Sequence, residues 1–199
     1  GRYRFRFHDE FSSASMTNDN KTYLSRELSQ LLLIDHQPTV ADAVQSIDRQ
    51  LLESNVIALA RVAYALGIPI TLTVLEDRDV SKPFYRDPEQ VLGGHTTVVR
   101  TSLNVWDDLQ VMGTLARNAR PQLVVSGLWT EQPVCSSAIS AMQGANYAVF
   151  VVTDACGGTT EESHALACRR MSVSGARLVT LKEALVQWQE STMLRAGPV

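Results

Sequence analysis

Short, continuous apolar runs separated by longer amphipathic stretches are the feature that most constrains the fold of this chain. The runs lie at residues 31–34, 68–74, 96–99, 123–125, 148–152 and 177–180. Strands that are apolar throughout are typical of sheets buried on both faces. The amphipathic stretches between them supply the helical crossovers that parallel strands require. We therefore predict a three-layer α/β/α fold of the Rossmann-like kind, with a six-stranded, mainly parallel sheet.

Helical periodicity in the intervening stretches predicts helices at residues 46–66, 107–118, 134–144, 161–174 and 181–189. Gly67 is suited to end the first of them. We expect one α/β domain over residues 29–190, preceded by an N-terminal extension over residues 1–28 and followed by a tail over residues 191–199. We interpret the extension as partly disordered or artificial, with Met16 as a candidate natural start.

Charge and cysteine content exclude several classes of protein. The chain of 199 residues has 18 basic and 21 acidic side chains, a balance that does not favour a nucleic-acid partner. No apolar run approaches the roughly 20 residues of a membrane-spanning helix, so we expect no membrane partner. Three cysteines cannot all pair, and neither they nor the histidines have metal-ligand spacing. We predict a reduced, cytoplasmic protein without metal or cofactor.

Two charged residues follow predicted strands, at the sheet edge where α/β folds bind ligands. Asp35 follows the first run, where partial burial raises a carboxyl pKa and favours acid or base chemistry; capping the next turn is the alternative. Arg100 follows the third run. Its cation can hold Asp35 ionised or bind a substrate carboxylate, and a surface ion pair is the alternative.

Cys135 follows the fourth run, at the predicted start of a helix. The helix dipole and free N–H groups lower a thiol pKa at such a position, although buried packing is the alternative. We expect packing roles for Cys156 and Cys168. His36 and His95 have no second ligand at metal spacing, which favours pocket or structural roles.

Five segments in order resemble the isochorismatase-like superfamily, and most closely its cysteine hydrolases of unassigned substrate. They are LLLIDHQ (31–37), VVRTSLNVWDD (98–108), VVSGLWTE (124–131), VFVVTDACGG (149–158) and RRMSVSGARLVT (169–180), and the resemblance covers residues 29–189. It implies a parallel sheet flanked by helices, a small-molecule substrate cleaved at an amide-type C–N bond, and assembly into a homo-oligomer. It also implies a catalytic Asp, Lys and Cys, in which the Cys attacks and the Asp takes its proton.

The resemblance assigns roles to residues of this chain. Asp35 matches the family Asp, and Arg100 stands at the position of the Lys, where a neutral amine base is excluded because Arg stays protonated. Trp106 and Trp129 could stack on a flat substrate or pack in the core. The motif segments place further residues at the pocket: His36, Gln37, Asn104, Trp106, Thr130 and Glu131.

The nucleophile position departs from the family pattern G-x-x-T-E-x-C. The segment from Gly127 reads GLWTEQP, which puts Pro133 at the nucleophile position and Cys135 two residues later. Keeping Pro133 there needs fewer insertions, but a displaced Cys135 stays open. Proline has no thiol, and it has no N–H to donate to an oxyanion. The same register places the cis peptide that shapes the family's oxyanion hole at Leu128–Trp129.

Three functions therefore stay open. The first is a cysteine hydrolase with Asp35 as base, Arg100 as electrostatic partner and Cys135 as nucleophile. The second needs no thiol: the resemblance offers isochorismatases that cleave a vinyl ether by acid catalysis from the Asp alone. The third is a catalytically degenerate protein retained for ligand binding or assembly.

Overall fold

The computed structural model describes residues 22–86, 88–92 and 95–196, so most of the predicted extension, Met16 included, lies outside the described residues. Six strands alternate with helices along the chain. Their bounds are Ser29–Ile34 (β1), Ile70–Leu75 (β2), Thr96–Arg100 (β3), Gln122–Gly127 (β4), Ala148–Val152 (β5) and Arg177–Val179 (β6). Each predicted strand is present, with ends shifted by no more than two residues.

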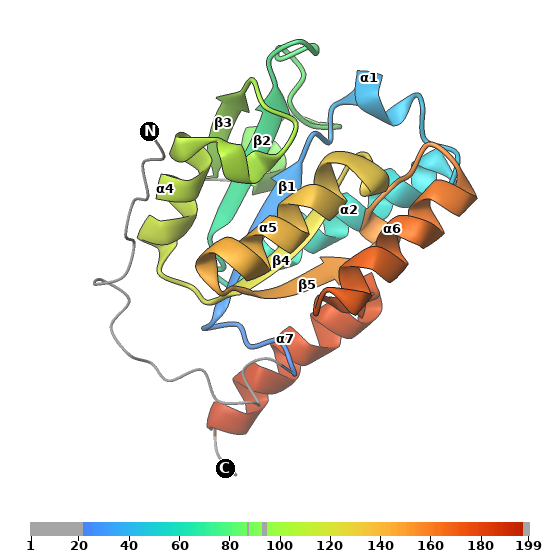
Figure 1. Cartoon of the computed structure of the whole chain (residues 1–199). Coiled ribbons are helices and arrows are strands. Elements are labelled where there is room, and N and C mark those ends of the chain that lie inside the picture. Colours follow the sequence, from blue (N-terminus) through green and yellow to red (C-terminus); the bar gives the residue numbers. More distant parts are fainter. Residues whose placement is uncertain (1–21, 87, 93–94, 197–199) are drawn as a thin grey trace, which may run out of the picture.

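The strands form one sheet in the order β3-β2-β1-β4-β5-β6, and each neighbouring pair is parallel. Figure 1 shows β1 and β4 at the middle of this sheet. The chain thus starts at the centre, builds to one edge, and returns to build to the other. The carboxyl ends of β3, β2, β1 and β4 are consecutive neighbours along one sheet edge, which brings Arg100, Asp35 and Gly127 together.

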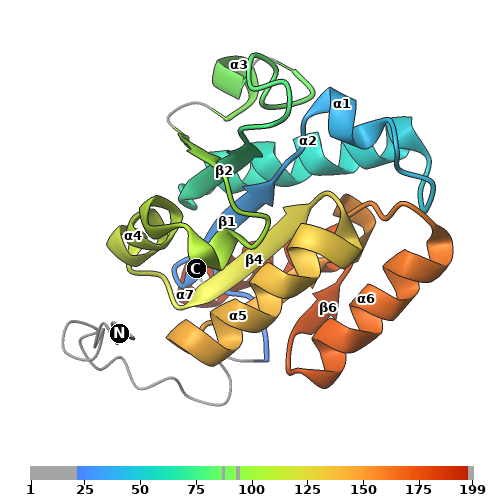
Figure 2. The same cartoon turned by 45° about the horizontal axis from the view of Figure 1, so that its top comes forward.

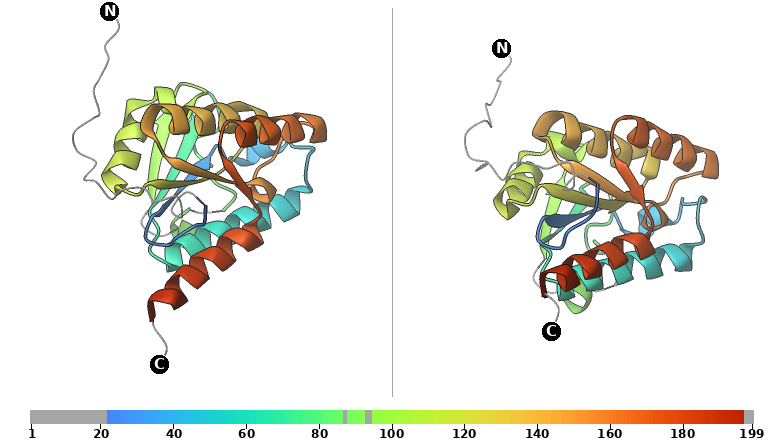
Figure 3. Two further views of the ribbon diagram at one scale, coloured as in Figure 1. Left: turned by 60° about the horizontal axis from the view of Figure 1, so that its bottom comes forward. Right: turned by 90° about the horizontal axis from the view of Figure 1, so that it is seen from below.

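Helices cover both faces of the sheet (Figure 3). One face carries α2 (Arg49–Ala65) and α7 (Leu181–Ala196), and the other carries α4 (Leu109–Asn118), α5 (Cys135–Ala145) and α6 (Glu161–Val173). Two short helices, α1 (Pro38–Ala41) and α3 (Pro88–Leu92), follow β1 and β2 (Figure 2). Short turns η2 (Val105–Asp107), η3 (Thr130–Val134) and η4 (Thr153–Ala155) complete the chain. The predicted three-layer α/β/α fold is confirmed.

The surroundings of β1 explain why the run at residues 31–34 is apolar without alternation. Leu31 and Leu33 belong to the core that faces α2 and α7, whereas Leu32 and Ile34 belong to the core that faces α4, α5 and α6. All four are fully buried. A strand covered on both faces gains from burying every apolar side chain, so apolar residues stand at all four positions of this run.

Capping residues set the helix starts that periodicity alone placed too early. The Asp48 side chain accepts a hydrogen bond from Leu51 N, so α2 begins at Arg49 rather than residue 46. Asp108 caps α4 in the same way by accepting from Val111 N, so that helix begins at Leu109 rather than residue 107.

Helix α7 is longer than the sequence pattern predicts, ending at Ala196 rather than residue 189. Polar contacts anchor it beneath the start of β1: Trp188 Nε1 donates to Ser29 Oγ at 3.0 Å, and Gln187 Oε1 accepts from Leu24 N at 2.8 Å. These partners are distant in sequence, and through such contacts Leu24 is buried and residues 25–28 are half-buried. Over the part of the chain that the structure describes, no helix combines the length and apolar character needed to cross a bilayer.

Candidate active site

Asp35 and Arg100 form a buried ion pair at the carboxyl ends of β1 and β3. Arg100 Nη2 donates to Asp35 Oδ2, and the side chains are 0% and 5% exposed. Asp35 N donates to Thr73 O of β2, which lies between the two strands. Asp35 also adopts a positive φ of 54°, which turns the chain sharply after β1. The predicted proximity of these two residues is therefore present.

The pKa of Asp35 is set by two opposed effects. Burial raises it, the charge and hydrogen bond of Arg100 lower it, and burial prevails, so that the pKa rises from 3.8 to about 6. Arg78 lowers it further through its charge. Asp35 Oδ1 is buried and has no hydrogen-bond partner among the described residues. The carboxyl group therefore has one oxygen fixed by a cation and one oxygen left for chemistry.

The terminal nitrogens of Arg100 bind other residues of the protein and are not available to a ligand. Besides Asp35, its guanidinium donates through Nη1 to the carbonyls of Ser102 and, at 3.3 Å, Leu103. Only Nε lacks a partner within the described part of the chain, and it is buried. These contacts make Arg100 the fixed counter-ion of Asp35.

His36 is a buried structural residue. Its Nε2 lies 2.8 Å from Ser126 Oγ and its Nδ1 lies 3.2 Å from Tyr85 Oη. Ser126 Oγ gives its own proton to Ala155 O, so Nε2 donates and Nδ1 accepts. Burial lowers the pKa of His36 to about 3. A neutral imidazole thus links β1, β4 and the loop before α3, and it takes no proton at neutral pH.

Arg78 is a second cation near Asp35, and it was not among the site residues predicted from the sequence. It lies just beyond the end of β2, and its guanidinium carbon lies 6.0 Å from the centre of the Trp129 ring. Trp129 is held in turn by donation from its Nε1 to Val40 O at 3.0 Å. No motif covers residues 76–94. The signal that could have found Arg78 is a cation within three residues of a predicted strand end.

Cys135 does not face the ion pair. Its Sγ lies 3.9 Å from Ala167 O of α6, within the core that α4, α5 and α6 share. Burial raises its pKa, in contrast to the lowering expected at a helix start. The reason is that α5 begins at Cys135 itself and turns the thiol into packed side chains rather than solvent. Pro133, two residues earlier, is also buried.

The segment after β4 lies close to β1. A side chain on Gly127 would come within 2.7 Å of Ile34 Cβ and 2.9 Å of Ile34 O, so glycine permits the approach. The Leu128–Trp129 peptide bond is cis, at the position expected by counting from Gly127, and the Gln132–Pro133 bond is also cis. Pro133 therefore follows the segment that begins at Gly127, where the chain passes close to β1.

The remaining predicted pocket residues divide into two groups. Gln37 donates to Asp79 O at 3.0 Å, close to the Asp35 loop. The other residues have partners elsewhere. Asn104 Oδ1 accepts a hydrogen bond from Trp106 N, and the Trp106 ring packs edge-on against Tyr147, with ring centres 5.6 Å apart. Thr130 Oγ1 lies 2.8 Å from His164 Nδ1, and Glu131 Oε1 accepts a hydrogen bond from Thr159 N. Trp106 therefore packs beside α5 and does not face Asp35.

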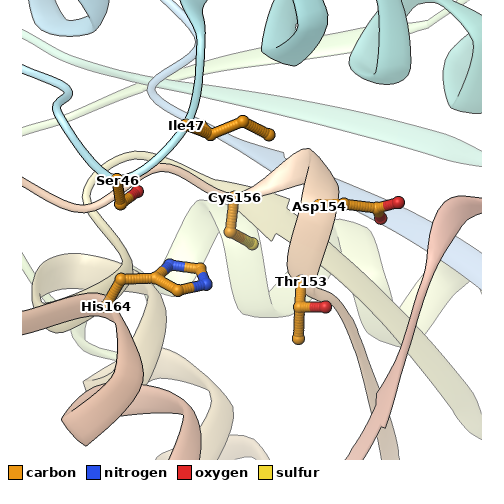
Figure 4. Close-up of a pocket in the computed structure, with 6 residues that line it drawn as sticks. All are labelled: Ser46, Ile47, Thr153, Asp154, Cys156 and His164. Atoms are coloured by element: carbon orange, nitrogen blue, oxygen red, sulfur yellow. The ribbon is translucent and has the colours of Figure 1, made fainter. Parts of the chain in front are cut away.

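A cavity of ~210 Å³ lies beyond the end of β5 (Figure 4). His164 and Cys156 face each other across it, and its lining residues are Ser46, Ile47, Thr153, Asp154, Cys156 and His164. Burial raises the pKa of Cys156 to about 12, so its thiol stays protonated and inert. No lining residue belongs to the Asp35–Arg100 pair. Among the described residues, no group of three or more His, Cys, Asp or Glu side chains is placed to hold a metal ion.

Comparison with known proteins assigns this arrangement to a family. The isochorismatase domain model matches residues 29–183, which contain the whole sheet and both members of the ion pair. The chain belongs to the isochorismatase family. It is 29% identical to the probable hydrolase YcaC of Escherichia coli K12 over 158 residues, which cover 79% of this chain and 76% of that protein.

Several solved structures share the fold of this chain. The E. coli YcaC gene product, an octameric hydrolase of unknown specificity, matches with a TM-score of 0.80 and 28% identity over 84% of this chain and 82% of that one. YcaC from Pseudomonas aeruginosa, solved with hexane-2,5-diol and covalent acrylamide, has the same TM-score with 24% identity, covering 84% and 83%. Nicotinamidase PncA from Bacillus subtilis matches at 0.65 and 15% identity, covering 76% and 99%.

Proposed function

We propose that this isochorismatase-family chain is a small-molecule hydrolase in which Asp35 transfers protons and no thiol takes part. The observation that carries the proposal is the buried pair of Asp35 and Arg100, with Oδ2 held by the guanidinium and Oδ1 unpartnered among the described residues. Such a carboxyl group can give and take a proton from one direction. An acid-labile vinyl ether is the substrate class that needs no more than this.

The proposed reaction balances with Asp35 and one water molecule. Protonated Asp35 gives its proton to the terminal vinyl carbon, which leaves the adjacent carbon as an oxocarbenium ion. Water adds to that carbon and returns a proton to the Asp35 carboxylate. The resulting hemiketal breaks its C–O bond and releases a ketone and an alcohol. Arg100 stabilises the carboxylate while the proton is away.

The pKa of Asp35 supports this role. Burial raises it to about 6, which keeps part of the carboxyl population protonated near neutral pH. Arg100 prevents a still larger rise, so the proton can also leave. An ordinary exposed aspartate would be almost wholly ionised under the same conditions.

Cleavage of an amide-type C–N bond is less well supported. That route needs a thiolate near Asp35, whereas the Cys135 thiol faces Ala167 O and burial raises its pKa. The contacts of Cys135 therefore favour the thiol-independent reaction over the displaced nucleophile. We also propose that copies of the chain assemble with one another, because the similar E. coli YcaC structure is octameric. The cytoplasmic location stays a prediction.

The simplest test uses 2-methoxyacrylate, a small vinyl ether whose hydrolysis gives pyruvate and methanol. We expect pyruvate release at least ~100-fold above the uncatalysed rate, the lower end of what one positioned acid supplies. N-acetylglycine, an amide that also carries a carboxylate, should stay intact. Hydrolysis of N-acetylglycine alone would contradict the proposal in favour of the thiol route. Hydrolysis of neither compound would favour the binding or assembly protein.

A further inference from the structure

The position of Arg78 follows from the strand order. Arg78 comes three residues after β2 ends, and Trp129 comes two residues after β4 ends. Strand β1 lies between β2 and β4, and its last residue precedes Asp35. An arginine that reaches from β2 to within 6.0 Å of the Trp129 ring centre therefore crosses above the end of β1. The effect of Arg78 on the Asp35 pKa agrees with this placement.

The two arginines at this sheet edge differ in what they can bind. The Arg100 side chain is 0% exposed, and its terminal nitrogens are used by Asp35, Ser102 O and Leu103 O. The Arg78 side chain is 41% exposed, and among the described residues its ion pair is a 3.6 Å contact from Nε to Asp77 Oδ1. Its terminal nitrogens make no hydrogen bond to any residue in the described part of the chain. Arg78 is therefore the arginine whose terminal N–H groups are available to bind a ligand.

We propose that Arg78 binds the anionic group, a carboxylate, of the small-molecule substrate above Asp35. The Arg78 guanidinium carbon lies over the Trp129 ring, 6.0 Å from its centre, where the ring attracts the cation and leaves its N–H groups free for two parallel N–H···O bonds. Asp35 Oδ1 is buried. A carboxylate that draws Arg78 toward itself uncovers this oxygen and places the rest of the substrate over it. This inference rests on the proposed function and names the substrate class of the same site.

The test measures binding with a pair of compounds that lack the vinyl ether on which the proposed reaction acts, and NMR spectra of the mixtures check that the amide stays intact. 2-Methoxypropanoate and 2-methoxypropanamide are saturated, nearly isosteric, and differ in charge. The indole N–H signal of Trp129 reports binding in ¹H–¹⁵N spectra, since the chain has three tryptophans and Trp129→Phe identifies the signal. We expect the carboxylate to bind at least ~10-fold more tightly than the amide at low ionic strength.

Variants in the same loop separate direct binding from general charge. Arg78→Gln should bring the two affinities within about twofold of each other, and Arg78→Lys should keep part of the difference. Lys82→Gln, which removes another cation of this loop, should leave the difference unchanged. Asp77→Asn should strengthen carboxylate binding, because Asp77 competes for Arg78.

The proposal is overturned if the wild type binds both compounds equally, if it binds neither, or if Arg78→Gln keeps the full preference. Because neither compound carries a vinyl ether, these outcomes are independent of the reaction proposed at Asp35. A carboxylate preference without hydrolysis of 2-methoxyacrylate would contradict the proposed function alone. Hydrolysis without the preference would contradict the role of Arg78 alone.

Discussion

Asp35→Asn should lower kcat/KM for 2-methoxyacrylate by about 10²- to 10⁴-fold, while Cys135→Ser should change it by less than about threefold. The asparagine keeps the size of the side chain and an oxygen for Arg100, but it cannot supply the proton. The serine keeps the buried packing of Cys135 beside α6, and the proposed reaction makes no use of the thiol.

Two controls accompany the comparison of Asp35→Asn with Cys135→Ser. Asp107→Asn removes an exposed carboxylate from η2 and should leave kcat/KM unchanged. Circular dichroism and thermal unfolding of Asp35→Asn should show that the fold is retained. A Cys135→Ser variant as inactive as Asp35→Asn, with an intact fold, would restore the displaced nucleophile.

Arg100→Leu should lower the free energy of unfolding by about 3–5 kcal/mol at pH 8, as expected when one partner of a buried ion pair is removed. The loss leaves the Asp35 carboxylate buried without a counter-ion and frees the carbonyls that Arg100 binds. Urea unfolding at pH 8 and pH 5 measures the effect. It should be smaller at pH 5, because Asp35 titrates near pH 6 and its neutral form needs no counter-ion.

The double variant Asp35→Asn/Arg100→Leu keeps this prediction testable if the single variant is hard to purify. Removing the orphaned charge should recover at least about 1 kcal/mol relative to Arg100→Leu. Equal stability of the single and double variants, or a loss that does not depend on pH, would contradict the account of the ion pair.

The sheet was predictable from sequence because parallel strands buried on both faces are apolar throughout. Residues 31–34 show this directly, with successive leucines packed against helices on opposite faces. Helix ends were less predictable, since they depend on single caps such as Asp48 and on the distant contacts that extend α7. Apolar periodicity carries no information on either.

The site was predictable only where it depends on the strand ends. Asp35 and Arg100 follow their strands immediately, so strand order alone brings them together. Side-chain direction beyond the strand ends was not predictable: Trp106 packs against Tyr147, and Cys135 turns toward α6. Arg78 was missed because its role depends on β2 and β4 flanking β1, which is a property of topology rather than of any local motif.

The dependence of kcat/KM on pH tests the central claim most directly. With 2-methoxyacrylate as substrate, we predict that kcat/KM is level at low pH and falls as pH rises through about 6, because the protonated form of Asp35 is the one that acts. Wild type and Cys135→Ser should give the same profile. A rise of kcat/KM with pH toward the range in which thiols ionise, absent from Cys135→Ser, would contradict the claim that Asp35 works without a thiol.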